Sequence, residues 1–195
     1  MEITPKEAQE LLRETDSVVK DMRAKLAYGV VGPILIAWGA VWIVCFAITH
    51  YLPTISGTAW LVGDAFGIAA SVYLGYRSAR GGAVCSEASK RLGWRLFWFW
   101  LLLFLYGDIW LAVLRPSSWE HIGLFIVTLV MFAYVVMGLW LGMRFLLWLG
   151  LLGTLLACAG YVFSIAVPGY LDLWLGLTCG TALFGSGVYL TLRWR

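Results

Sequence analysis

The stretch at residues 71–77 reads SVYLGYR, and it ends the second of six long apolar runs in the chain. Similar endings recur at 138–144, which reads GLWLGMR, and at 187–193, which reads GVYLTLR. Aligned on its arginine, each copy has a small residue six positions earlier, an aromatic residue four earlier and leucine three earlier. One proline marks the turn upstream of each copy: Pro53, Pro116 and Pro168. The pattern predicts three tandem helical hairpins, with prolines on one side of a membrane and arginines on the other.

The composition supports a membrane protein. Of 195 residues, 62% are hydrophobic and 13% are charged, whereas soluble domains contain about 25% charged residues. A helix needs about 20 apolar residues to cross the hydrocarbon core of a bilayer. The apolar runs of that length lie at roughly 29–50, 58–76, 93–114, 122–142, 146–167 and 172–192. We therefore expect an all-α integral membrane protein, a six-transmembrane-helix bundle at 29–195 built of hairpins 29–77, 93–144 and 145–193.

The basic residues predict the orientation. All but one of the 14 lysines and arginines fall on the side that holds the N-terminus, and Arg115 is the exception. Because cytoplasmic loops are enriched in basic residues, both termini are expected in the cytoplasm. The first residues contain no cleavable signal pattern. In organisation the chain resembles the small six-span bacterial acid-resistance membrane proteins, which are also built of repeated hairpins, and the cytoplasmic (inner) membrane of a bacterium is the expected location.

The segment 1–28 is expected to form a separate cytoplasmic amphipathic helix. Thr4-Pro5-Lys6-Glu7 fits a helix-capping box that would start the helix. Apolar residues then follow at the 4-3-4 spacing of a coiled-coil seam, including Leu12, Val19, Met22 and Leu26. The helix either lies against the protein's own inner face or the bilayer surface, or it docks a partner or a second copy.

Two acidic residues interrupt the apolar runs. Asp64 and Asp108 both fall in the outer half of the membrane, with Trp60 and Trp110 within about a turn of them. An intramembrane carboxylate is costly, so each is a candidate for proton, cation or small-molecule binding. The alternative is structural: a protonated aspartate hydrogen-bonds between helices, or Asp108 pairs with Arg115.

Other chemistry has little support in the sequence. His50 and His121 are expected as solvated groups near the outer surface, and Asp172 as a residue favoured at a helix N-terminus. The four cysteines have no metal-binding spacing, so no metal or cofactor is expected. Catalytic motifs and basic nucleic-acid-binding helices are also missing, which favours a protein that is not an enzyme and does not bind nucleic acid.

Three functions remain to be weighed. The preferred one is a non-enzymatic membrane protein that acts through association with a protein partner or as a homo-oligomer, as an accessory subunit, regulator or scaffold. The alternative is a small-solute or cation transporter that uses Asp64 and Asp108. A membrane enzyme acting on lipid or quinone is less favoured, because the sequence offers no nucleophile–base pair.

Overall fold

The computed structural model describes residues 27–80, 87–116 and 118–193, and this part of the chain contains six helices long and apolar enough to cross a membrane. The first five are α2 (Gly32–Tyr51), α3 (Ser56–Arg80), α4 (Glu87–Leu114), α5 (Trp119–Leu141) and α6 (Arg144–Ala166). The sixth joins α7 (Leu171–Leu175), the π-helical turn η3 (Gly176–Gly180) and α8 (Thr181–Arg193). Short turns η1 (Ala27–Val31) and η2 (Pro53–Ile55) flank α2. The prediction of an all-helical protein with six membrane-length helices is confirmed, whereas the predicted helix at 4–27 lies outside the described residues.

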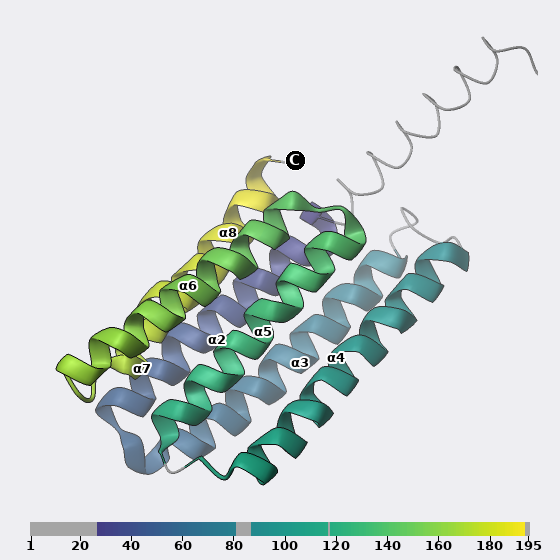
Figure 1. The fold of residues 1–195 in the computed structure, drawn as a ribbon. Coiled ribbons are helices and arrows are strands. Elements are labelled where there is room, and N and C mark those ends of the chain that lie inside the picture. Colours follow the sequence, from purple (N-terminus) through teal and green to yellow (C-terminus); the bar gives the residue numbers. More distant parts are fainter. Residues whose placement is uncertain (1–26, 81–86, 117, 194–195) are drawn as a thin grey trace, which may run out of the picture.

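The turns fall at two opposite ends of the bundle (Figure 1). We call the end with the turns after α2, α4 and α6 the proline end, because Pro53, Pro116 and Pro168 lie in those turns. The other is the arginine end, where α8 finishes and α5 turns into α6. That turn uses Gly142, whose φ of 64° is left-handed, and Met143 N–H donates to the Gly138 carbonyl at 2.8 Å.

Two helices extend beyond the spans that the sequence predicts. The membrane-length segments end at Arg77 and begin at Arg91, close to the predicted 76 and 93, whereas α3 continues to Arg80 and α4 begins at Glu87. The intervening basic and small polar residues are compatible with a helix that extends beyond the apolar core. A helix does not have to end where its apolar pattern ends, because its backbone hydrogen bonds form equally well outside the hydrocarbon.

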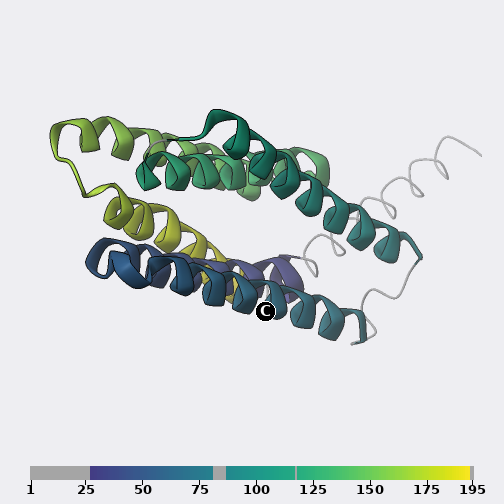
Figure 2. The same ribbon diagram turned by 90° about the horizontal axis from the view of Figure 1, so that it is seen from below.

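The six spans form two layers (Figure 2). One layer contains α3, α2 and α8, with α2 in the middle, and the other contains α4, α5 and α6, with α5 in the middle. The layers meet where α7 and η3 pack on α6. The tightest packing joins α2 to α8 and α5 to α6, which belong to different predicted hairpins. The arrangement as three equivalent hairpins therefore stays a prediction.

Glycines bring the backbones together in both tight pairs. A Cβ on Gly187 of α8 would stand 2.6 Å from the Gly32 carbonyl oxygen and 2.6 Å from the Ile36 nitrogen. A Cβ on Gly150 of α6 would collide with the Met131 carbonyl oxygen of α5. Small residues at such crossings drive helix association in membranes, where close van der Waals packing replaces the hydrophobic effect.

Burial is distributed unevenly among the spans. Only 6% of the apolar window of α3, and 6% of that of α4, is buried, against 33–39% in the other four spans. The largest fully buried side chains all come from the other four spans: Leu35, Val127, Met131, Leu146, Leu171, Leu175, Cys179 and Leu183. The core is therefore made by α2, α5, α6 and the sixth span, and α3 and α4 are attached to its sides.

Candidate functional site

Asp64 lies on the face of α3 that packs against α2. This face of α3 fits closely against α2, since Gly63 leaves no room for a side chain. A Cβ at this position would stand only 2.7 Å from the Cys45 sulfur of α2. One turn earlier, the Trp60 indole donates to the Thr49 hydroxyl at 3.0 Å. Asp64 is half-buried, and its carboxylate is close enough to the Cys45 thiol to interact with it electrostatically. Within the described residues the Asp64 side chain makes no hydrogen bond.

The small-residue ridge of α3 continues beyond Asp64. A Cβ on Gly67 would stand 2.9 Å from the Trp38 ring, and the Trp38 indole donates to the Ser71 hydroxyl at 3.0 Å. These small residues therefore let α2 approach α3 closely. Gly75, the last member of the ridge, has no atom within 4 Å of where a Cβ would be.

Asp108 lies on the opposite layer, on α4, and is exposed. Its neighbour Gly107 faces α5, where a Cβ would stand 2.7 Å from Leu129. Trp110 is also exposed, at 53%. Among the residues that the structure describes, Asp108 forms no ion pair or hydrogen bond. The structure therefore does not bring Asp64 and Asp108 together. Trp60 contacts α2 and helps to hold α3 on it, whereas Trp110 is exposed on α4.

A second polar group gathers at the proline end. His50, at the end of α2, lies with Nδ1 3.1 Å from the Gly169 carbonyl oxygen, and its ring contacts Tyr170. Asp172, in the first turn of α7, is half-buried and interacts electrostatically with both His50 and Glu120. From the sequence, His50 is expected as a solvated surface group and Asp172 as a separate residue at a helix N-terminus. The fold brings the ends of α2, α5 and α7 together, and no local sequence pattern indicates this.

The other histidine joins α5 to α6. His121 Nδ1 lies 2.7 Å from the Ser118 hydroxyl, and Nε2 lies 3.2 Å from the Tyr161 hydroxyl. Ser118 also accepts a hydrogen bond from the His121 backbone N–H at 3.4 Å, which caps the N-terminus of α5. The contacts of His50 and of His121 thus connect the ends of neighbouring helices. In the described part of the chain, no three histidine, cysteine or acidic residues are placed to hold a metal ion.

The sequence pattern alone implies one continuous α-helix for the sixth span. In the structure η3 interrupts this helix between α7 and α8. Here the Thr178 hydroxyl donates to the Trp174 carbonyl at 2.7 Å, and the buried Cys179 thiol donates to Gly153 of α6 at 3.6 Å. Such π-helical turns are frequent at functional sites. Gly176 and Gly180 of this turn also fit closely against Phe46 and Ile43 of α2.

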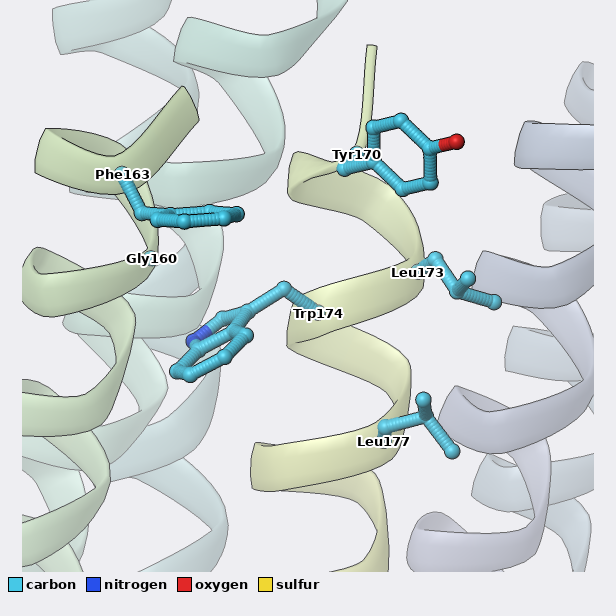
Figure 3. A pocket seen from close by; sticks show the side chains of 6 residues that line it. All are labelled: Gly160, Phe163, Tyr170, Leu173, Trp174 and Leu177. Atoms are coloured by element: carbon cyan, nitrogen blue, oxygen red, sulfur yellow. The ribbon is translucent and has the colours of Figure 1, made fainter. Parts of the chain in front are cut away.

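A small apolar pocket of about 120 Å³ opens between α6 and the sixth span (Figure 3). Trp174 points toward Gly160, where a Cβ would collide with its ring, and its indole donates to the Leu156 carbonyl at 2.9 Å. The Phe163 ring stacks on Trp174 at 6.2 Å. Neither Asp64 nor Asp108 lines this pocket, which is formed by Gly160, Phe163, Tyr170, Leu173, Trp174 and Leu177.

The predicted interaction residues Leu12, Val19, Met22 and Leu26 lie outside the described residues. Comparison of the chain with protein-family models, with curated proteins and with solved structures found no match.

Proposed function

We propose that this is a non-enzymatic membrane protein that acts through association, as an accessory subunit, regulator or scaffold. The observation that carries the proposal is the near absence of burial in α3 and α4, at 6% of each span. Four spans are sufficient to build the core, so the two outer helices add surface within the membrane. A helix that contributes little to its own fold is free to contribute to an interface.

Of the two outer helices, α4 offers the larger free surface. It packs mainly on α5, through the Trp100–Tyr134 ring contact at 5.9 Å and the close fit of Gly107. Its other side exposes large apolar groups along its length, such as Trp94 at 61% and Leu105 at 51%. Helix association in membranes depends on van der Waals packing along extended faces. This side of α4 is the surface that we assign to a partner.

Photo-crosslinking in native membranes tests the proposal. A photoreactive phenylalanine analogue replaces Leu105 on α4 in one variant, and Leu155 on the exposed side of α6 in another. The Leu155 position is a matched control, because its side chain is 65% exposed in the single chain. We expect one discrete protein adduct from α4 and none from α6. Lipid adducts alone from both positions would refute association through α4.

The N-terminal segment is the second element of the proposed association. Its coiled-coil spacing at Leu12, Val19, Met22 and Leu26 favours docking outside the membrane. Deletion of residues 1–27 is expected to abolish partner binding while the six-span bundle still folds. Detergent sizing that finds the same complex before and after the deletion would contradict association through this segment.

A small-solute or cation transporter is the second candidate. The half-buried Asp64, with no hydrogen bond among the described residues, and the π-helical interruption of the sixth span favour it. Asp108 lies in the other layer, so this candidate rests on Asp64 alone. Asp64→Asn should eliminate proton- or cation-coupled uptake into proteoliposomes, and Asp108→Asn should retain it. Wild-type uptake by both variants would exclude a carboxylate-coupled mechanism.

A further inference from the structure

The exposed side of α4 carries a regular seam. Its members are spaced 4-3-4-3-4 along the helix and are all exposed, and we call them the α4 seam: Trp94, Trp98, Leu101, Leu105, Asp108 and Ala112. This is the spacing at which one helix packs lengthwise on another with a small left-handed crossing angle. The residues that face α5, such as Leu96 and Gly107, lie on the opposite side of α4. A further helix can therefore pack along the seam without displacing α5.

Asp108 is the acidic member of the seam, and it falls inside the membrane-length segment Arg91–Leu114. It precedes Leu114, the last residue of α4, by six positions, or about 9 Å along the axis at 1.5 Å per residue. Its side chain is too short to reach the membrane surface from that depth, unlike lysine or arginine. An exposed carboxylate at this position faces lipid in the single chain, and burying an acidic group in the bilayer without a partner costs free energy.

The described residues do not supply a cation for Asp108. Arg115 is the basic residue nearest to Asp108 at the proline end, but it is seven positions further along and begins the turn. Its φ of 43° is left-handed, so the backbone leaves the helix axis there. Among the described residues, Arg115 and Asp108 form no ion pair. The other described lysines and arginines fall at the arginine end of the bundle, and the two histidines of the proline end contact Gly169, Ser118 and Tyr161 instead.

We infer that the α4 seam binds a transmembrane helix of a different protein that carries a lysine or arginine at the depth of Asp108. This inference rests on the proposed function and names the chemistry of its partner. Pairing the carboxylate with a cation neutralises both groups in the membrane, so the complex has no isolated charge there. The small side chain of Ala112, one turn from Asp108, leaves space for a long basic side chain to approach.

A second copy of the chain fits this seam less well. Two copies in the same membrane orientation would bring Asp108 to the same depth in each, so two carboxylates would face each other. Like charges at short range in a low dielectric disfavour each other. Arg115 of a second copy would stand about 10 Å from Asp108 along the axis, at 1.5 Å per residue. Charge complementarity therefore favours a different protein.

The experiment uses the full chain in phosphatidylcholine vesicles with synthetic transmembrane peptides as probes. One peptide is all leucine across the membrane, and the other has a single lysine six residues from one end of the span. A donor dye at the N-terminus of the protein and an acceptor on the peptide report binding by energy transfer. The protein variants are Asp108→Asn and, as a matched control on α3, Asp64→Asn.

We expect the wild-type protein to bind the lysine peptide with a Kd at least tenfold lower than that of the leucine peptide. Asp108→Asn should reduce this preference to threefold or less, and Asp64→Asn should retain it. Equal binding of both peptides by the wild type would overturn the inference. In that case a crosslink from Leu105 to a native protein would still support the proposed function, so the two failures are distinguishable.

A second readout separates the partner from a second copy. Mixed donor- and acceptor-labelled copies of the protein, without peptide, should show only the energy transfer expected from random collisions. Energy transfer between copies that Asp108→Asn removes would overturn the inference, because the α4 seam would then bind another copy of the chain. Circular dichroism and detergent sizing of each variant confirm that the bundle is folded, so a loss of binding is not a loss of structure.

Discussion

Substitution of Gly187 by alanine should destabilise the protein through the α2–α8 contact. The added Cβ would stand 2.6 Å from the Gly32 carbonyl oxygen and 2.6 Å from the Ile36 nitrogen, whereas ordinary contact begins at 3.4 Å. Both neighbours are backbone atoms, so neither can rotate away. The two helices must separate by about 0.8 Å, and a gap of that size forfeits roughly a quarter to a half of the dispersion energy between the facing atoms.

The magnitude follows from the same contact. Overpacking a tight interface costs about 1–3 kcal/mol, and we expect about 2 kcal/mol for Gly187→Ala. The control is Gly185→Ala, two residues earlier on α8, where no atom lies within 4 Å of the added Cβ. There the better helix propensity of alanine should stabilise the protein by about 0.5–1 kcal/mol.

The assay is reversible unfolding in mixed micelles, in which the SDS fraction is raised and the loss of helix is followed by circular dichroism. The two variants should differ by roughly 2 kcal/mol in the free energy of unfolding, with Gly187→Ala the less stable, because the gain in helix propensity is common to both. Equal stabilities, or a Gly187→Ala variant more stable than Gly185→Ala, would refute the argument that backbone contact at Gly187 holds α8 on α2.

Two further predictions concern hydrogen bonds between helices. Trp38→Phe and Ser71→Ala each remove the hydrogen bond from the Trp38 indole to the Ser71 hydroxyl. A double-mutant cycle in the same unfolding assay should give a coupling free energy of about 0.6 kcal/mol, the average for such bonds in membranes. Additive effects of the two substitutions would show that the bond is not made. Tyr161→Phe removes the hydroxyl that contacts His121 Nε2 and should cost about 0.5–1.5 kcal/mol. Tyr170→Phe is its control, because the contact of Tyr170 with His50 is through the ring, and an equal loss in both variants would contradict the assignment.

The sequence predicts the six membrane-length helices well, because helix length and apolar composition are local signals. Apolar length identifies the spans, and the prolines and arginines mark their ends. The six membrane-length helices can therefore be recognised without knowing which helices contact one another. The side of the membrane on which each end lies is still a prediction from the charge distribution.

The helix pairing could not be predicted in the same way. Glycines occur in all six spans. The sequence does not distinguish Gly187, which lies against the backbone of α2, from Gly185, which has no atom within 4 Å of where a Cβ would be. That difference arises only from the relative position of two helices far apart in the chain. The same reason explains why the contacts of His50 and Asp172 were not predicted, since His50 lies 119 positions from Gly169 and Asp172 lies on a different helix from Glu120 and His50.

The candidate site was predicted in part. The sequence identifies Asp64 and Asp108 as exceptional because both are acidic residues in apolar runs, and it places them at similar depth. It treats them as one possible site, whereas they lie in different layers with different surroundings. The sequence contains the 4-3-4 spacing of the α4 seam, but it does not show that the seam is exposed in the single chain. A helix side that faces lipid and one that packs on another helix are both apolar, so the sequence pattern is the same for both.

The most direct test of the central claim is native mass spectrometry of the protein extracted from its own membrane in a mild detergent. The account predicts a discrete complex of this chain with a fixed number of partner subunits, retained in Asp64→Asn and lost in Asp108→Lys, which places like charges together. A mass equal to the single chain with bound lipid, identical for the wild type and both variants, would contradict the claim that the protein acts through association along α4.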